Sequence, residues 1–408
     1  MNRIVIVGAS LAGLRTAEAL RELGFEGQIA MIGDETELPY DRPPLSKQFL
    51  RGDWDTDRIT LRSQDELSNR LKLELTTGTR ALELRPDAHE VVLSDGRTLA
   101  YDRAVIATGA RARTLPAAEV HQSAHVVRTK DDSAMLRTCL TTDARIVVVG
   151  AGFIGAEVAA SAKALGCDVT IIEAAPVPLE RQLGLAMGGA CGALHARNGV
   201  SLRCGIGVSS FEPNAVLLAD GTRLPADHVV VGVGARPNTE WLVSSGLVIT
   251  DGIAVDEFCR AKLVDGTVLD DVVAVGDVAR FPNRRYESTD GSGAPLSMRI
   301  EHWTNAADMA LAAANTLLGH TVVYQPVPYF WSDQYSHKIQ FFGRADGFDE
   351  VRVVDGDPDD AAWVALYRRG DRLVAALGVS KIRALVPFRQ MLLDNASWAT
   401  AIELTSTR

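Results

Sequence analysis

The sequence contains little cysteine, and no two of its cysteines lie close enough in the chain to form a paired motif. Its 408 residues include five, at Cys139, Cys167, Cys191, Cys204 and Cys259. A scattered, odd-numbered set argues against a disulfide framework and lacks the ligand spacing of a zinc site. We therefore expect reduced thiols, a cytoplasmic location and no metal centre.

Long apolar runs are absent as well. The best candidate, residues 146–165, is interrupted by Glu157 and Lys163, whereas a membrane span needs about 18 or more apolar residues with few or no charges. The first apolar run breaks at Gly8, so no signal peptide is expected. The formal net charge of −10 argues against a general nucleic-acid binder. The apolar fraction of 47% is that of a globular protein, and the length predicts two or three domains.

What the sequence does contain is an internal repeat. Residues 4–13 (IVIVGASLAG) are matched by residues 146–155 (IVVVGAGFIG). In each copy a short apolar run predicts a buried parallel strand, and the glycine turn after it leads into a helical pattern. The predicted helices are 14–23 and 156–165, and the predicted second strands are 28–32 and 168–172. Each copy is therefore the βαβ opening of a dinucleotide-binding fold.

Antiparallel strands are predicted elsewhere in the chain. Each βαβ unit is followed by a hairpin with an Asp-Gly turn, at 90–99 and 216–224. Residues 271–277 are predicted to form a buried strand that ends in an acid, and residues 286–295 a polar surface loop. After about residue 320 the pattern becomes antiparallel. Its predicted strands are 329–331, 339–342, 351–354, 363–367 and 373–378, followed by a helix at 386–393.

The second glycine loop has the complete pattern of a dinucleotide site. Gly150 makes the tight turn, Gly152 lets the backbone approach a pyrophosphate, and Gly155 allows close packing of the helix. Glu173 follows 23 residues after Gly150, where an acid hydrogen-bonds the ribose 2′-hydroxyl. A carboxylate there favours NADH over NADPH, although Arg181 downstream leaves NADPH open.

The first glycine loop departs from the pattern at one position. It has Gly8 and Gly13, but Ser10 stands where the second glycine belongs. The side chain of Ser10 either crowds the pyrophosphate or donates a hydrogen bond to it. Asp34 is the matching ribose acid, with Glu35 as the alternative.

Two different nucleotide sites in one chain imply two ligands, and the natural pair is a bound flavin and a diffusing nicotinamide. Thr108 and Gly109 follow one further predicted strand, and Gly234 follows another. Asp277, the last residue of the predicted strand at 271–277, is suited to accept hydrogen bonds from a ribityl chain.

These features resemble a known family, the FAD-dependent NADH:ferredoxin reductases of bacterial oxygenase systems, of the putidaredoxin reductase and biphenyl dioxygenase ferredoxin reductase type. The resemblance covers essentially the whole chain. Its most specific segment is residues 38–47 (LPYDRPPLSK). The supporting segments are 126–129 (VVRT), 276–277 (GD), 299–305 (RIEHWTN) and 330–334 (FWSDQ).

The resemblance implies roles for individual residues. It places Lys47 against FAD and Glu157 beside both the nicotinamide and Lys47, so that these two are the expected catalytic pair. The full set expected to bind FAD is Gly8, Ser10, Ala12, Gly13, Asp34, Lys47, Ala81, Thr108, Gly109, Arg128, Gly276, Asp277, Glu301, Trp303 and Trp331. The set expected to bind NADH is Gly150, Gly152, Phe153, Ile154, Gly155, Glu157, Glu173 and Gly234.

The expected fold class is α/β, with two Rossmann-like dinucleotide-binding domains as in glutathione reductase and a C-terminal α+β domain. The expected division is an FAD domain in two parts (1–110 and 245–319), an NADH domain (111–244) and the C-terminal domain (320–408).

The expected reaction follows from what is missing near the flavin. No cysteine precedes Cys139, so electrons must leave the flavin without a thiol relay. We expect hydride transfer from NADH to FAD and single-electron transfer to a small [2Fe–2S] ferredoxin, which supplies a cytochrome P450 or a Rieske-type oxygenase. The alternatives are a rubredoxin reductase, an NADH oxidase and a slowly turning over NADH sensor resembling apoptosis-inducing factor. The oligomeric state is left open.

Overall fold

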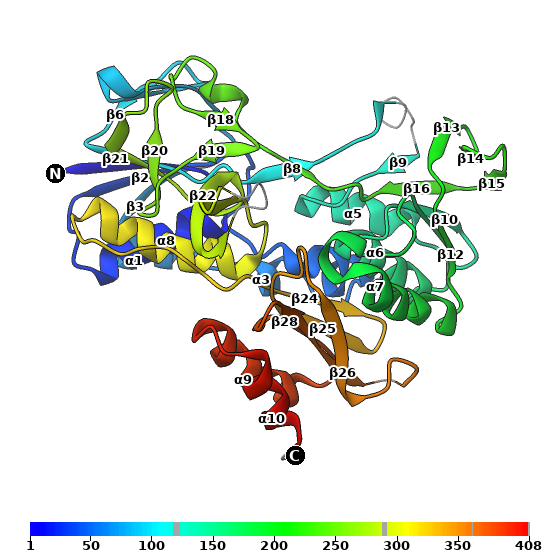
Figure 1. Cartoon of the computed structure of the whole chain (residues 1–408). Coiled ribbons are helices and arrows are strands. Elements are labelled where there is room, and N and C mark those ends of the chain that lie inside the picture. Colours follow the sequence, from blue (N-terminus) through cyan, green and yellow to red (C-terminus); the bar gives the residue numbers. More distant parts are fainter. Residues whose placement is uncertain (117–122, 288–291, 361, 407–408) are drawn as a thin grey trace. The chain divides into compact units, whose positions relative to one another are not determined.

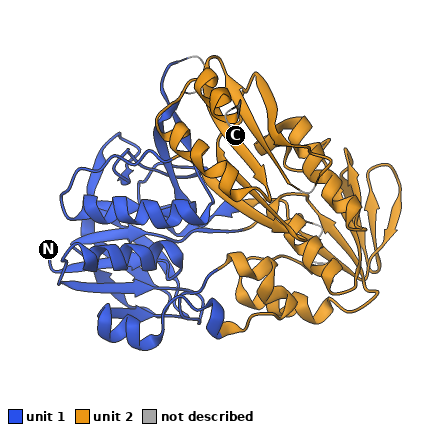
Figure 2. Cartoon of the chain, turned by 90° about the horizontal axis from the view of Figure 1, so that it is seen from below, with its two compact units in different colours: residues 1–41, 57–111, 236–326 blue, residues 42–56, 112–235, 327–408 orange. Residues whose placement is uncertain are grey.

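The computed structural model describes residues 1–116, 123–287, 292–360 and 362–406. The chain forms two compact units, coloured separately in Figure 2. Unit 1 comprises residues 1–41, 57–111 and 236–326, and unit 2 comprises residues 42–56, 112–235 and 327–408. The division into four segments predicted from the sequence stays a prediction. Its boundaries after residues 110 and 319 fall one and seven residues before points where the chain passes between units, and its boundary after residue 244 falls nine residues after such a point.

Unit 1 is built on a six-stranded sheet with strand order β20-β21-β7-β1-β2-β3. Strands β21, β7, β1, β2 and β3 are parallel, and β20 is an antiparallel edge. Helices α1 and α8 lie side by side in this unit (Figure 1). The bounds are β1 Arg3–Val7, α1 Leu11–Glu22, β2 Gln28–Ile32, β3 Leu73–Thr76, β7 Arg103–Ile106, β20 Arg260–Lys262, β21 Val268–Ala274 and α8 Trp303–Leu317.

Smaller sheets and turns complete unit 1. The predicted hairpin at 90–99 is formed by β5 and β6, which pair with β4. Further elements are α3 Thr56–Ile59, a π-helical turn Glu66–Arg70, β4 Ala81–Arg85, a 3₁₀ turn Pro86–Ala88, β5 Glu90–Leu93, β6 Thr98–Ala100, a 3₁₀ turn Glu240–Leu242, β18 Ile249–Thr250, β19 Gly252–Ala254, a 3₁₀ turn Gly276–Val278, β22 Ala279–Glu287 and β23 Pro295–Met298. Strands β8 Ala110–Ala112 and β17 Ala235–Pro237, which pair with each other, span two of the points where the chain passes between units.

Unit 2 contains a five-stranded parallel sheet with order β12-β11-β10-β16-β9. The predicted hairpin at 216–224 is formed by β14 and β15 in a separate three-stranded sheet. The bounds are a 3₁₀ turn Pro43–Ser46, α2 Gln48–Arg51, β9 Ala124–His125, α5 Lys130–Cys139, β10 Arg145–Val149, α6 Phe153–Ala164, β11 Asp168–Glu173, α7 Glu180–Arg197, β12 Ser201–Cys204, β13 Val208–Glu212, β14 Ala215–Leu218, β15 Arg223–Pro225 and β16 His228–Val231.

The C-terminal segment of unit 2 is an antiparallel sheet with order β24-β25-β28-β27-β26. It shares a buried core with α7, in which the hydroxyl of Tyr367 donates a hydrogen bond to the carbonyl of Leu183 at 2.9 Å. The bounds are β24 Tyr329–Gln334, β25 His337–Gly343, β26 Glu350–Gly356, β27 Trp363–Arg369, β28 Arg372–Val379, α9 Ile382–Leu393 and α10 Trp398–Ser406.

The fold class predicted from the sequence is confirmed. Each apolar run of the repeat is the central strand of a parallel sheet, β1 in unit 1 and β10 in unit 2, and all their apolar residues are buried. Such runs form central strands because both faces of the sheet are covered. Among the described residues, we find no helix that combines the length and the apolar character needed to cross a membrane.

Several predicted elements differ in detail. The strand expected at 271–277 ends at Ala274, because Gly276 adopts φ +73° and turns the chain, so Asp277 lies in a 3₁₀ turn. Helix α9 begins at Ile382 and accommodates Pro387, which the prediction had placed near its start, and α10 was not expected. The predicted loop at 286–295 is shorter, since β22 and β23 extend into it, and residues 288–291 lie outside the described residues.

Candidate functional site: two dinucleotide-type sheet edges

The residues expected to bind FAD in unit 1 come mainly from one edge of its parallel sheet. Gly8 follows β1, Asp34 follows β2, Thr108 follows β7, and Asp277 follows β21. These four strands are neighbours and parallel. Their carboxyl ends therefore meet at the same edge, which is where nucleotides bind in doubly wound sheets.

Close backbone contacts explain the glycines of the first loop. Gly8 has φ +122°, and a Cβ atom there would stand 2.1 Å from the carbonyl oxygen of Ala107. A Cβ atom on Gly13 would stand 2.0 Å from the carbonyl oxygen of Gly8. Ser10 precedes α1 with φ −124° and ψ −161°, an extended conformation that any residue adopts. The departure at Ser10 therefore creates no backbone strain.

The beginning of α1 is suited to an anion. No acidic residue lies in its first turn, and the side chain of Ser10 makes no capping hydrogen bond. The first amides of a helix lack partners within the helix and carry partial positive charge. Ala12 and Gly13 lie in this first turn, so a pyrophosphate is the kind of ligand that this end of the helix attracts.

The other predicted residues of unit 1 are held by hydrogen bonds. The Thr108 hydroxyl donates to the carbonyl of Asn238 at 2.8 Å, and the Asn238 amide donates to the carbonyl of Thr108 at 2.9 Å. The indole of Trp303 donates to Asp41 at 2.7 Å. Asp41 belongs to the 38–47 segment, so that segment helps to orient Trp303.

Three further residues expected to bind FAD, Asp34, Ala81 and Glu301, also lie in unit 1. Asp34 is exposed, and its carboxylate lies 3.6 Å from the guanidinium of Arg80. Ala81 is buried at the start of β4. Arg299 contacts both Glu301 and the backbone carbonyl of Asp277. Arg299 was not predicted as a site residue, although it lies in the RIEHWTN segment.

The residues expected to bind NADH collect in the same way in unit 2. Gly150 follows β10, Glu173 ends β11 and Gly234 follows β16, and these strands are parallel neighbours. The carboxylate of Glu173 accepts hydrogen bonds from the amides of Ala151 (2.7 Å) and Ala175 (2.8 Å). The predicted ribose acid is therefore hydrogen-bonded to the backbone of the glycine loop.

The start of α6 carries the remaining NADH candidates. Gly152 precedes the helix, and Phe153 and Ile154 are its first two residues. The ring of Phe153 lies 4.2 Å from the ring of Phe330, centroid to centroid, whereas Ile154 is 44% exposed. No acidic residue lies in the first turn of α6, so this helix end is suited to an anion like that of α1.

Glu157 is the centre of a buried polar network in unit 2. Its carboxylate accepts hydrogen bonds from the hydroxyl of Ser46 (2.6 Å), the ammonium of Lys47 (3.0 Å), the hydroxyl of Ser332 (2.8 Å) and the amide of Asp333 (3.0 Å). Lys47 and Glu157 are each only 4% exposed. The pair that the resemblance implied is therefore present, and its role towards a flavin stays a prediction.

Lys47 also has a second carboxylate partner. Its ammonium lies 3.2 Å from Asp333, which in turn pairs with Lys338 at 3.0 Å. The same ammonium lies 5.9 Å from the ring centroid of Trp331. Sequence reasoning did not assign Ser46, Ser332 or Asp333, although all three lie in the segments that carried the resemblance.

Arg128 precedes the capped start of α5. Its amide donates to Asp132 at 3.1 Å, and its carbonyl accepts from the guanidinium of Arg42 at 2.7 Å. Thus Lys47, Arg128 and Trp331 belong to unit 2, whereas the other residues expected to bind FAD belong to unit 1.

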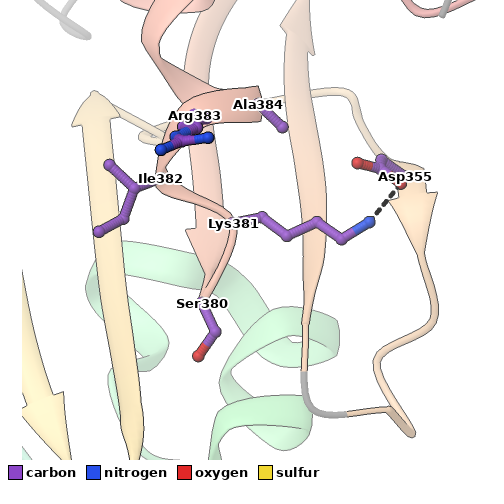
Figure 3. Close-up of a pocket in the computed structure, with 6 residues that line it drawn as sticks. All are labelled: Asp355, Ser380, Lys381, Ile382, Arg383 and Ala384. Atoms are coloured by element: carbon purple, nitrogen blue, oxygen red, sulfur yellow. Dashed lines mark hydrogen bonds and ion pairs between the residues drawn. The ribbon is translucent and has the colours of Figure 1, made fainter.

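The C-terminal segment carries a surface hollow of about 460 Å³ that none of the predicted site residues lines. It is lined by Asp355 and by residues 380–384. Figure 3 shows Lys381 directed towards Asp355, with which it forms an ion pair at 2.5 Å. No residue of the two glycine loops lines this hollow.

Comparison with known proteins agrees with this geometry. The family model described as pyridine nucleotide-disulphide oxidoreductase matches residues 2–310, and one described as reductase C-terminal matches residues 329–404. The chain belongs to the pyridine nucleotide-disulphide oxidoreductase family. The resemblance to ferredoxin reductases is confirmed, because relatives with that name match this chain over nearly its whole length.

Two relatives and one solved structure illustrate the similarity. Putidaredoxin reductase of Pseudomonas putida is 36% identical over 96% of this chain and 92% of its own length. The ferredoxin–NAD(+) reductase component of the anthranilate 1,2-dioxygenase system of Burkholderia cepacia is 37% identical over 96% of this chain and 94% of its own. The reductase in a covalent putidaredoxin reductase–putidaredoxin complex superimposes with a TM-score of 0.90 at 35% identity, covering 97% of this chain and 93% of that one.

The second glycine loop predicts that alanine substitutions at Gly152 and Gly155 have different effects on the free energy of unfolding. In Gly155→Ala the new Cβ atom would stand 2.0 Å from the carbonyl oxygen of Gly150. The variant should lose about 1–3 kcal/mol of unfolding free energy, as overpacked sites do. In Gly152→Ala no atom lies within 4 Å of the new Cβ, so stability should change by less than about 0.5 kcal/mol.

Thermal unfolding and NADH titration of both variants separate these effects. Gly152→Ala should raise the KM for NADH roughly tenfold, since the methyl group occupies the space through which the pyrophosphate approaches the backbone. Equal thermal destabilisation of the two variants, or an unchanged KM in Gly152→Ala, would contradict this account of the loop.

The buried network predicts that two lysines contacting the same carboxylate are not equivalent. Lys47→Met should cost about 3–5 kcal/mol of unfolding free energy, because it removes one partner of a buried ion pair. Lys338→Met is the matched control, since Lys338 also pairs with Asp333 but is 40% exposed and should cost less than about 1 kcal/mol. Denaturant unfolding measures both, and equal losses would show that burial of the Lys47–Glu157 pair does not matter.

Proposed function

We propose that the chain is an FAD-dependent NADH:ferredoxin oxidoreductase. The observation that carries the proposal is the presence of two dinucleotide-type sheet edges in one chain, one in each unit, without a cysteine among the first 138 residues. A two-site oxidoreductase of this kind must pass electrons from one ligand to the other and then out of the protein.

The cysteines support an exit without a thiol relay. All five are free, and Cys259 is the only one in unit 1. Cys259 is fully buried, and burial raises the pKa of its thiol far above the usual range. A buried neutral thiol is a poor nucleophile, so unit 1 has no candidate for the redox cysteine of a disulfide reductase or a cysteine-dependent peroxidase.

The residues at the edge of unit 1 fit FAD. Gly8 and Gly13 let the backbone approach closely, the amides at the start of α1 suit the pyrophosphate, and Asp277 lies in the 3₁₀ turn that follows β21. Asp34 would hold the adenosine ribose. When bound, FAD supplies the chemistry that the side chains lack, because it accepts a hydride and releases electrons one at a time.

Unit 2 would bind and orient NADH. The amides at the start of α6 would face the pyrophosphate, and the carboxylate of Glu173 would accept a hydrogen bond from the ribose 2′-hydroxyl. Lys47 and Glu157 would act as positioning residues for the reacting ends of the two cofactors, since their network holds three segments of unit 2 in one geometry.

A small [2Fe–2S] ferredoxin is the proposed electron acceptor, and through it a cytochrome P450 or a Rieske-type oxygenase. The support is the likeness to relatives whose names specify ferredoxin reduction, and to a reductase solved in complex with putidaredoxin. We place the protein in the cytoplasm, in keeping with its unpaired cysteines.

The first test is reduction of cytochrome c by NADH with and without a small [2Fe–2S] ferredoxin. We expect the ferredoxin to raise the rate of cytochrome c reduction at least tenfold. A one-electron carrier can accept electrons directly from a flavin, without a thiol between them. A matched run with a rubredoxin tests the alternative partner. If NADH bleaches the flavin but neither carrier stimulates turnover, oxygen uptake distinguishes an oxidase from an NADH sensor, and the proposal fails.

The second test concerns the choice of coenzyme. Glu173→Gln should lower kcat/KM for NADH by about 10–100-fold, the loss expected for a hydrogen bond to a charged group. The ratio of NADH to NADPH efficiency should fall, because a carboxylate repels the 2′-phosphate. Asp168→Asn, at the exposed opposite end of β11, is the control and should leave the ratio unchanged. A ratio that Glu173→Gln does not alter would remove Glu173 from the ribose site.

A further inference from the structure

Unit 2 contains a cluster of three metal-ligating side chains outside the dinucleotide edge. His125 ends β9, Cys139 is the last residue of α5, and His228 begins β16. One ligand atom from each lies within 4.8 Å of the other two. The three elements adjoin in the fold, since β9 pairs with β16 (Figure 1).

The spacing of these atoms matches what a tetrahedral ion requires. His125 Nε2 lies 3.2 Å from His228 Nδ1 and 3.8 Å from Cys139 Sγ. With Zn–N bonds of about 2.0–2.1 Å and Zn–S bonds of about 2.3 Å, tetrahedral ligand atoms lie roughly 3.3 Å (N to N) and 3.6 Å (N to S) apart. These two distances are therefore close to those of a zinc site, and the ligand atoms of the third pair, His228 and Cys139, lie within 4.8 Å of each other.

We propose that His125, Cys139 and His228 bind a single Zn²⁺ ion, with a water molecule in the fourth position. The ligand set, two imidazoles and one thiolate, is one that Zn²⁺ prefers and that Mg²⁺ and Ca²⁺ do not. This site is additional to the proposed reductase activity.

The surroundings are compatible with ion entry. All three side chains are half-buried rather than sealed in the core.

The position of the cluster separates it from the NADH site. His228 stands at the amino end of β16, whereas Gly234 follows the carboxyl end of the same strand. An ion held by β9, β16 and the last residue of α5 would fasten that helix to the edge of the sheet. Its expected effect is therefore on the stability of unit 2 and not on the chemistry of the nicotinamide.

The test uses the full-length, flavin-loaded protein, stripped of metal with a chelator and titrated with Co²⁺ and then Zn²⁺. We expect one Co²⁺ per chain, with the intense ligand-field bands of a tetrahedral site at longer wavelength than the flavin absorption and a thiolate-to-cobalt charge-transfer band. Zn²⁺ should displace the Co²⁺ and raise the midpoint of thermal unfolding, because a ligand that binds only the folded state stabilises it.

Two ligand variants and one control complete the design. Cys139→Ser should abolish the charge-transfer band, and both Cys139→Ser and His228→Gln should weaken Zn²⁺ binding by about 100-fold or more, exceeding the roughly 10–100-fold typical of outer-shell partners. Cys204→Ser, a half-buried cysteine of the same unit outside the cluster, should bind as the parent does. Metal-free unfolding of each variant checks that it folds.

Binding without a thiolate band, no stoichiometric Co²⁺ uptake, or equal affinity in Cys139→Ser and the parent protein would each overturn the proposal. Failure here leaves the reductase assay unaffected, because that assay measures electron flow and needs no added metal.

Discussion

The buried carboxylate of Glu157 is the interaction on which unit 2 depends most. It receives four donors from the two other segments of that unit, Ser46 and Lys47 from one and Ser332 and Asp333 from the other. Helix α6, which carries Glu157, begins directly after the second glycine loop. Because an unpaired charge at 4% exposure is costly, the three segments can take few other arrangements, and the beginning of α6 is fixed along with them.

The same backbone device appears in both units. A Cβ atom on Gly13 would meet the carbonyl oxygen of Gly8 at 2.0 Å, and one on Gly155 would meet that of Gly150 at the same distance. In each loop the third glycine is thus required by the close approach of helix and strand, independently of any ligand. The middle position is different, since Gly152 has open space and Ser10 is extended. The repeat therefore preserves the packing constraint in both copies and varies at the middle position, where packing sets no such constraint.

The sequence predicts what depends on local pattern and misses what depends on long-range contact. Strands β1 and β10 were predictable because continuous apolar runs end in glycine turns. Lys47 was predictable because it lies in the most specific segment of the family resemblance, and Glu157 because it closely follows the second glycine loop. Asp333 was not assigned, since its contact with Lys47 joins residues 286 positions apart. Pro387 obscured the start of α9, because proline usually ends a helix and here lies inside one. The sequence did not predict the cluster of His125, Cys139 and His228. These residues come from three separate elements and lie far apart in the sequence, so no short ligand motif marks them.

The distribution of thiols gives the two units different chemical character. In unit 1 the single cysteine is sealed in the core, so nothing there can take over electrons from a flavin through sulfur. A flavin bound at that edge would therefore deliver its electrons to an acceptor without a protein thiol as intermediate. In unit 2 two cysteines are half-buried, Cys139 and Cys204, and Cys139 lies against two imidazoles. The ion proposed for this cluster would hold the sulfur of Cys139 as a ligand and so withdraw it from redox exchange.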